Sequence, residues 1–529
     1  MQRCRVAFAR SLSVGLLGCW SAMAAVPPPG IDPAPAPLAA PAAPAAIQPP
    51  AAGARALSLQ ECLELALQHN LDVRIERVNP EIERYNLSLV YAGYDPAFSF
   101  QYTHRDSTDP STYDASIRQT IPGSESESDT FVAGLRGVLP TGADYNIGLT
   151  SLTDSYGTRF PTAFPVPFES SQGSARFGLT QPLLKNLWID RTRMNVWVGR
   201  KSIQISELAL ADRIMRIAAQ VEQAYYDLIY ARENVGVQEQ ALQLAERLLA
   251  ENKQRVKVGA MAPLDEKQAE SQVAARRADL IASQRTLATR QNTLKNLLSD
   301  DYAGWGAQTI VPSERLEALR QLLDLQDSWS KGLAQRPDLR ELQVQLEQQD
   351  IVLRFNRNQL LPQLDLTGSY GLTGVGDEFS DALGGISRAD APNWSVGAIF
   401  SFPLSNRAAR ETYRRSQADQ RKLLLSYKKA EQGIMLEIDN ALKLAQSNFE
   451  RIDATQKARE FAEAALDAEQ KKLENGKSTS FVVLQLQRDL TVARLEEISA
   501  LAEYNKSLSQ LALAEGSILE RHRIGIQPR

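Results

Sequence analysis

The chain has 529 residues, of which 43% are hydrophobic and 23% are charged, and its formal net charge is −4. This length is sufficient for several ordinary domains, and the slightly negative charge excludes a broadly basic surface for nucleic acid. A mean hydropathy of −0.30 and the lack of any 18-residue apolar run exclude a helical membrane protein. The alternating strands of a β-barrel would leave no such run and stay possible.

Cysteine and histidine residues are too few and too dispersed for a disulfide framework or a metal centre. Cys4 and Cys19 lie in the first twenty residues, so only Cys62 remains in the rest of the chain. The three His residues are distant from one another in the sequence. No Gly-rich phosphate loop precedes a predicted helix and no nucleophile elbow occurs, so we predict no enzyme activity, no cofactor and no metal site.

Residues 1–24 have the features of a secretory signal peptide. They carry three Arg residues, then a short apolar stretch, and end in a small-x-small cleavage site at Ala24. A second interpretation is open, because the LLGC motif that ends at Cys19 resembles a lipobox, in which this cysteine would become lipidated. Cleavage after Ala24 is favoured because Trp20 is a bulky neighbour for lipidation. Either route takes the protein out of the cytoplasm.

Residues 25–56 are almost all Pro, Ala and Gly, a composition that cannot bury a core and predicts an extended linker. From residue 57 onward, the chain follows one plan twice. The segments Asp72–Pro96 and Asp338–Pro362 have equal length, and each has the pattern of a helix followed by a strand. We therefore predict lead-in helices over 57–96 and a corresponding helix over 332–361.

Each lead-in helix is followed by a segment in which apolar and polar residues alternate, as in antiparallel strands with one polar face. In the first segment, 97–182, Phe98 and Tyr102 fall on the same face. This segment also contains an inserted alternating pair at 130–152, which has the pattern of a hairpin. The second segment covers 362–404. The pattern leaves open whether the inserted pair joins the main sheet.

Two long helical hairpins are predicted after the strand segments, over 183–298 and 405–522. Only Pro263 interrupts these segments, so each helix can run for many turns. Apolar residues repeat every seven positions, as at Leu242 and Leu249, which predicts an antiparallel coiled-coil seam. The remaining two segments are an equatorial connector over 299–331 and a C-terminal tail over 523–529.

The order of these motifs resembles that of the TolC-like outer-membrane efflux proteins, or outer-membrane factors. The motifs are the duplicated LSLQECLELALQHNLDVR and LAQRPDLRELQ, the strand exits QPLL and FPLS, and the bends RVKVGAMAPLD and KLENGKSTSF. The resemblance covers about Leu57 to His522. It implies an α+β membrane protein with an internal two-fold repeat: a trimeric β-barrel, about four strands per protomer, continued by a long periplasmic α-helical coiled-coil tunnel. Since an unclosed sheet edge cannot sit in lipid, such strands would require oligomerisation.

The two hairpin bends are the predicted docking sites for a periplasmic adaptor. Gly259, preceded by Val258, and Gly476 are suited to the left-handed backbone that a helix end often needs. Leu264 and Phe481 lie five residues after the two glycines, in equivalent positions. They are expected to be exposed for a partner; the alternative is that both pack inward and close the hairpins. Three copies of the chain would place six such bends in one ring.

The helices that follow the bends are predicted to contain the entrance of the tunnel. The family's namesake narrows its entrance with two Asp residues three positions apart after the second bend. The equivalent positions here are Val482 and Gln485, whereas Asp265, with Gln268 three positions further, follows the first bend. Three copies of Asp265 would place carboxylates in a confined mouth, which attracts cations; a solvated charge at a helix start is the alternative.

The resemblance implies an exit duct in the bacterial outer membrane, with an extension into the periplasm. It would serve a tripartite efflux or type I secretion system and export cargo passively. The implied partners are two further copies of the chain, a periplasmic membrane-fusion adaptor, an inner-membrane transporter and outer-membrane lipid, without nucleic acid. The alternative is a periplasmic coiled-coil adaptor or scaffold without a pore, which would not need strands with one apolar face.

Overall fold

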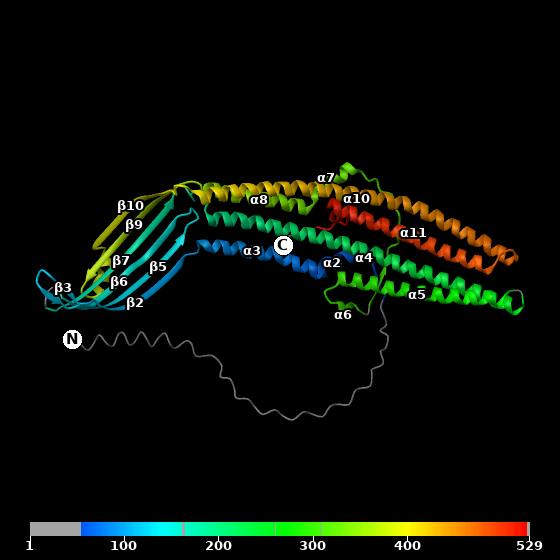
Figure 1. Ribbon diagram of the computed structural model, residues 1–529, viewed down its shortest axis with the longest axis horizontal. Helices are drawn as coiled ribbons and strands as arrows, with labels where there is room; N and C mark the ends of the chain where they lie inside the picture. The colour runs from blue at the N-terminus through cyan, green and yellow to red at the C-terminus, as the bar shows by residue number, and fades with distance from the viewer. Residues whose placement is uncertain (1–53, 161–163, 260, 307, 526–529) are drawn as a thin grey trace, which may run out of the picture. The chain divides into compact units, whose positions relative to one another are not determined.

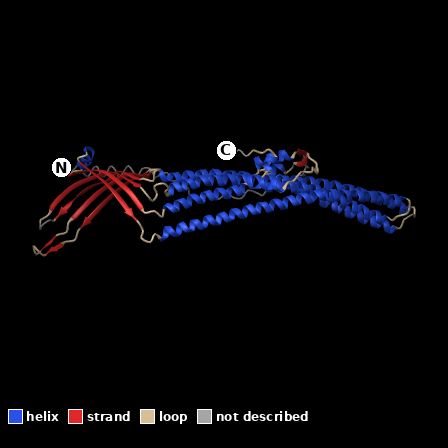
Figure 2. Ribbon diagram, turned by 90° about the horizontal axis from the view of Figure 1, so that it is seen from above, coloured by secondary structure: helices blue, strands red, loops and turns tan. Residues whose placement is uncertain are grey.

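The computed structural model describes residues 54–160, 164–259, 261–306 and 308–525. The predicted signal peptide, the lipobox cysteine Cys19 and most of the predicted linker lie outside these residues. Within the described residues, a sheet lies at one end of the long helices (Figure 1). Figure 2 shows that the strands and the helices run in broadly the same direction, so the chain passes from strand to helix at one end of the sheet.

In both halves of the chain, two shorter helices precede the strands and two long helices follow them, but the first half has more strands than the second. The first half is α2 (Leu59–His69), α3 (Leu71–Tyr91), η1 (Ala92–Tyr94), β2 (Ala97–Thr108), β3 (Thr112–Asp114), β4 (Gln119–Ile121), β5 (Glu125–Val138), β6 (Asp144–Arg159), β7 (Val166–Pro182), α4 (Arg191–Lys257) and α5 (Pro263–Leu298). The second half is α7 (Leu325–Gln335), α8 (Pro337–Asn358), β9 (Gln363–Gly376), α9 (Phe379–Arg388), β10 (Ala391–Ser401), α10 (Arg407–Glu474), α11 (Ser480–Glu515) and α12 (Ile518–Arg521). The connector contains α6 (Tyr302–Trp305) and β8 (Thr309–Pro312).

Two of the predicted boundaries need correction. The linker was predicted to continue to residue 56, but Ala54–Leu57 form strand β1, which pairs in parallel with β8. The predicted helix over 332–361 is α8, and the preceding α7 starts inside the predicted connector at Leu325. Pro337 separates the two helices, because its ring occupies the first turn of α8 and cannot continue α7.

The main sheet has six antiparallel strands in the order β10-β9-β7-β6-β5-β2. The expectation of about four strands per protomer is therefore wrong. The inserted pair predicted at 130–152 forms most of β5 and β6, and these strands pair with each other and with β2 and β7. The short hairpin β3–β4 lies outside this sheet.

The longest helices are α4, with 67 residues, and α10, with 68. Each is about 100 Å long at 1.5 Å per residue. The carboxylate of Asp190 caps α4 by accepting a hydrogen bond from the backbone N–H of Arg193 at 2.7 Å. At the other end, Gly259 has a φ of +74° and Gly476, after α10, a φ of +70°. These left-handed conformations end the helices and allow the chain to reverse.

The largest apolar core surrounds the middle of α4. Val221, Tyr225 and Leu228 of this helix are fully buried against α2, the end of α5 and β1–β8. A second core joins α10 to α7, α8 and α11 around Ile438. A third lies between the hairpins near their bends, where Leu248 packs with residues of α10 and α11. The helices are thus held together along their length by burial of apolar surface.

In the part of the chain that the structure describes, the apolar stretches of the helices are too short or too charged for any helix to cross a membrane.

Candidate functional site at the sheet and the hairpin ends

One face of the six-stranded sheet carries a continuous apolar band. The pairing register places six side chains in a single row across all strands: Phe98, Leu135, Ile147, Phe177, Tyr370 and Trp394. All six are exposed, from 36% for Leu135 to 76% for Trp394. Isolated exposed apolar residues are common, but a contiguous patch of this kind marks an interaction with lipid or with another protein.

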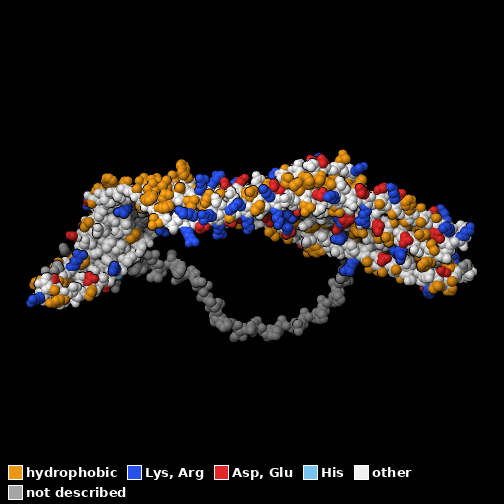
Figure 3. Space-filling view, turned by 45° about the horizontal axis from the view of Figure 1, so that its top comes forward, with side chains coloured by type: hydrophobic (Ala, Val, Ile, Leu, Met, Phe, Trp, Pro, Cys, Tyr) orange, Lys and Arg blue, Asp and Glu red, His pale blue; other side chains and the backbone are white. Residues whose placement is uncertain are grey.

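The opposite face of the sheet is polar. Two polar rows flank the apolar row. One consists of Ser99, Gly134, Gly148, Arg176, Gly371 and Asn393, and the other includes Arg136, Asn146, Ser369 and Ser395. Such a sheet is suited to lie between lipid and water. Figure 3 shows hydrophobic side chains gathered where the strands meet the helices, whereas charged side chains of both signs are scattered along the helices.

The apolar band ends toward the far end of the strands, away from the helices. There the carboxylate of Asp129 accepts hydrogen bonds from Tyr102, at 2.7 Å, and from His104, at 2.9 Å. Helix α9 packs on the same face, and the ring of Phe379 lies 5.7 Å from the ring of Phe131. This helix therefore covers part of the face that carries the apolar band.

Both edges of the sheet lack a strand partner in the described residues. The edges are β2 and β10, and nearly every residue of these strands is exposed. Unpaired N–H and C=O groups on an edge strand are a template for pairing with another strand. The sheet is therefore complete only if its edges are covered by further chain.

The predicted docking residues lie at the free ends of the two hairpins, the farthest points from the sheet (Figure 1). Val258 is 76% exposed, Leu264 is 66% exposed and Phe481 is 60% exposed. Gly259 and Gly476 form the two bends. The predicted alternative, in which Leu264 and Phe481 pack inward to close the hairpins, therefore does not describe this chain.

The predicted entrance residues lie in the first two turns after each bend. Asp265 and Gln268 are half-buried on α5, whereas Val482 and Gln485 are exposed on α11. The two hairpins contact each other here through residues that the sequence did not single out. The side-chain amide of Asn252 donates a hydrogen bond to Ser480 at 2.7 Å, and Arg255 donates to the carbonyl of Leu473 at 3.3 Å.

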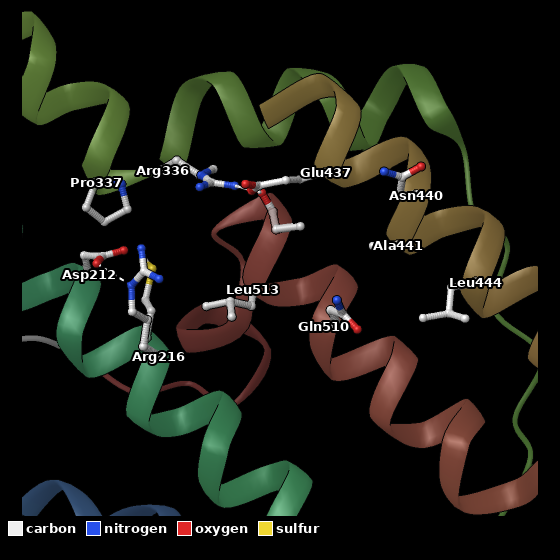
Figure 4. A pocket seen from close by; sticks show the side chains of 12 residues that line it. Asp212, Arg216, Arg336, Pro337, Glu437, Asn440, Ala441, Leu444, Gln510 and Leu513 are labelled. Carbon is white, nitrogen blue, oxygen red and sulfur yellow. Dashed lines mark hydrogen bonds and ion pairs between the residues drawn. The ribbon is translucent and has the colours of Figure 1, made fainter. Parts of the chain in front are cut away.

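A charged cavity of about 300 Å³ lies midway along the helices, between α4, α10, α11 and the start of α8. Arg336 lies between Asp338, at 2.6 Å, and Glu437, at 2.5 Å, and Arg216 binds Asp212 at 2.6 Å on the other side (Figure 4). Burial opposes the charge of Arg336, but the two carboxylates outweigh burial and raise the pKa of its guanidinium. Every cation here has a carboxylate partner, so the cavity joins helices and presents no free charge to a ligand.

A second buried charge connects the C-terminal segment to α4. Glu222 is fully buried and accepts a hydrogen bond from His522 at 3.1 Å, with Arg521 at 4.0 Å. Burial opposes the charge of this carboxylate, but His522 and Arg521 outweigh burial and lower its pKa. Burial, with the nearby Glu222, raises the pKa of Tyr226 to about 12. A Glu beside the apolar heptad position Val221 was the signal that could have predicted a buried ion pair.

The chain is similar to known outer-membrane proteins. OpmQ, the pyoverdine export outer membrane protein of Pseudomonas aeruginosa, is 25% identical over 313 residues, which cover 57% of this chain and 63% of OpmQ. The probable outer membrane lipoprotein SilC of Salmonella typhimurium is 22% identical over 365 residues, which cover 68% of this chain and 70% of SilC. The alignments thus span about two thirds of these relatives.

Among solved structures, the CmeC outer membrane channel of Campylobacter jejuni has a similar fold, with a TM-score of 0.64 at 17% identity. The alignment covers 87% of this chain and 85% of CmeC. The model of the outer membrane efflux protein family matches residues 162–299 and 329–517, which include parts of both halves. The chain therefore belongs to the outer membrane efflux protein family, which confirms the resemblance drawn from its motifs and its predicted location in the outer membrane.

Proposed function

We propose that the protein is the outer-membrane exit duct of a tripartite efflux or type I secretion system and that it works as a homotrimer. Cargo would arrive from an inner-membrane transporter through a periplasmic adaptor and leave passively through the duct. No step of this role requires catalysis or a cofactor. The observation that carries the proposal is the six-stranded sheet with one apolar face, one polar face and two free edges.

The free edges support a barrel that is shared between copies. If β10 of one copy pairs with β2 of the next, no backbone group faces lipid without a partner. Three copies with six strands each would give eighteen strands, a size that leaves an aqueous channel. The apolar row through Phe98 and Trp394 would then face lipid, and the polar row through Arg176 would face water. A periplasmic scaffold without a pore would have no use for this segregation.

The helices support assembly with neighbouring copies as well. Helix α8 packs against both α4 and α10, whereas its counterpart α3 packs mainly against α4. The uncovered side of α3 bears an exposed apolar stripe at heptad spacing: Leu71, Ile75, Val78, Ile82, Tyr85 and Leu89. By analogy with α8, we expect α10 of a neighbouring copy to cover this stripe.

The hairpin ends support docking to an adaptor. Two exposed bends per chain would become six in a trimer, a ring that suits a ring of partner hairpins. Asp265 and Gln268 after the first bend, and Val482 and Gln485 after the second, would then lie around the entrance. An outer-membrane duct that is closed here by packed helices would open when the hairpins separate.

The first test is the state of the protein in cells. Outer-membrane fractions should contain a detergent-extracted trimer that migrates as one species until it is heated. Ile82→Asp should reduce the yield of this trimer several-fold, because it places a charge in the apolar stripe of α3. Ser88→Asp introduces the same charge at an exposed polar position of α3, about 100° around the helix from the stripe, and should leave the yield unchanged. Recovery of the wild-type chain only as a soluble periplasmic protein would contradict the proposal.

A further inference from the structure

The charges of the six-stranded sheet are segregated between its two faces. All four arginines of these strands lie on the polar face by register: Arg105, Arg136, Arg159 and Arg176. Six of the eight acidic residues lie on the opposite face: Asp106, Glu125, Glu127, Asp129, Asp154 and Glu169. Only Asp144 and Asp365 share the polar face with the arginines. The six strands contain no lysine.

Arg136 and Arg176 are the central pair of this basic face. They lie on β5 and β7, in the two polar rows that flank the apolar row, and both are exposed. Among the described residues, neither guanidinium forms an ion pair. Both line a groove of about 560 Å³, whose floor includes Gly178. Asn146 lies over this glycine: a Cβ atom at position 178 would be only 2.2 Å from the Oδ1 atom of Asn146.

The acidic residues near this groove lie at the end that is closest to the helices. Asp95 and Asp144 line the groove at that end. Asp365 is buried one row closer to the helices and accepts a hydrogen bond from Gln363 at 2.5 Å. Beyond Arg176 the polar face continues with Ser and Thr residues to Arg105. A solute leaving the helices would therefore pass carboxylates first and then arginines.

We propose that the strand-lined part of the duct is an anion-selective exit, suited to cargo that bears carboxylate or phosphate groups. This inference rests on the proposed function, in which the polar face lines a water-filled barrel. In three copies, the strands would give this lumen twelve arginines and six carboxylates, and Asp95 would add three more carboxylates. The excess positive charge, enclosed by walls of low dielectric constant, raises the local concentration of anions.

The test uses the full-length trimer in planar bilayers. Because the Asp265 carboxylates at the entrance would favour cations, every channel in this test carries Asp265→Asn. Under a KCl gradient, the reversal potential of this background should show preference for chloride over potassium. Inorganic tripolyphosphate added on the side of the strand loops should block the current. The double variant Arg136→Gln/Arg176→Gln should lose the chloride preference, and its half-blocking tripolyphosphate concentration should rise about tenfold. Asp144→Asn should shift the reversal potential in the opposite direction.

Two further variants separate charge from structural damage. Arg136→Lys/Arg176→Lys keeps both charges and should retain the chloride preference. Arg388→Gln removes an arginine of α9, the helix that packs on the other face of the sheet. Arg388 pairs with Asp390 at 3.0 Å, and this variant should behave as its parent channel. A cation-selective Asp265→Asn background, or a double Gln variant with unchanged selectivity, would overturn the inference and leave the duct intact. A correctly inserted trimer without any conductance would instead overturn the proposed function itself.

Discussion

Asn252 of the first hairpin and Ser480 of the second are each only 1% exposed and are joined by a 2.7 Å hydrogen bond. Both lie close to the bends, so this bond holds the two hairpin ends together. Ser480→Ala would leave the buried Asn252 amide without this acceptor, at a cost of about 1–3 kcal/mol. We expect faster amide hydrogen exchange over residues 470–485 and a larger basal conductance than in the wild type.

The matched control is Ser478→Ala. The Ser478 hydroxyl donates to Glu469 at 2.5 Å, within the second hairpin alone. Its loss should leave the contact between the hairpins intact, so conductance should stay at the wild-type level. Equal effects of the two alanine substitutions would mean that the Asn252–Ser480 bond does not hold the ends together.

The stability of the C-terminal segment is predicted to depend on pH through Glu222. The folded-state pKa of this carboxyl lies below its usual value, because His522 and Arg521 outweigh the opposing effect of burial. A depressed pKa stabilises the fold above the unfolded-state pKa of about 4.3, and this contribution is lost as the pH falls through the folded-state pKa. Cleavage in the C-terminal segment by a protease that is active in acid should therefore accelerate as the pH falls below the unfolded-state pKa, relative to the cleavage of an unfolded substrate.

Glu222→Gln tests this assignment. The variant should release the C-terminal segment already at neutral pH, and its proteolysis should vary less with pH. Glu520→Gln is the control, because Glu520 is exposed and contacts Gln335 rather than Arg521. An acid response in Glu222→Gln as large as that of the wild type would assign the pH dependence to another group.

Asp265 is predicted to bind multivalent cations at the entrance of the duct. It is half-buried in the first turn of α5, two residues after Pro263, and a trimer would bring three copies together. A trivalent cation added on the side of the hairpins should block conductance, and Asp265→Asn should weaken the block about tenfold. Glu266→Gln removes the adjacent carboxylate, which points about 100° around the helix, and should leave the block unchanged. Undiminished block in Asp265→Asn would identify Asp265 as a solvated helix-start charge.

Much of the architecture could be predicted because it depends on local patterns. Alternation identified the strands, and the absence of proline identified the long hairpins. The number of strands was not predictable in the same way, because the alternation of β5 and β6 does not specify their partners. Their place in the sheet follows from pairing with β2 and β7. The contact of Asn252 with Ser480 joins residues 228 positions apart, and no local pattern specifies such a pair.

The seam near the bends shows the limit of heptad analysis. Leu242 and Leu249 continue the apolar repeat, yet both are half-buried, whereas Leu248 is 5% exposed and packs with Leu466 and Leu473 of the second hairpin. We predict that Leu248→Ala lowers the free energy of unfolding by about 2–5 kcal/mol and that Leu242→Ala costs clearly less. Thermal unfolding of the two trimers would measure the difference. Equal losses would place Leu242 in a seam between copies.

The exposed tips give the most direct test of partner docking. Leu264 and Phe481 are 66% and 60% exposed beside the bends, so replacing either with arginine removes no buried contact within the chain. The double variant Leu264→Arg/Phe481→Arg should insert as a folded trimer with normal conductance.

Its cross-linking to the periplasmic adaptor and its export activity should nevertheless fall at least about tenfold, because an apolar contact would be replaced by two charges. Glu474→Arg adds an arginine at an exposed position near the second bend and should retain both activities. Full cross-linking and export in the double variant would place the adaptor elsewhere on the helices.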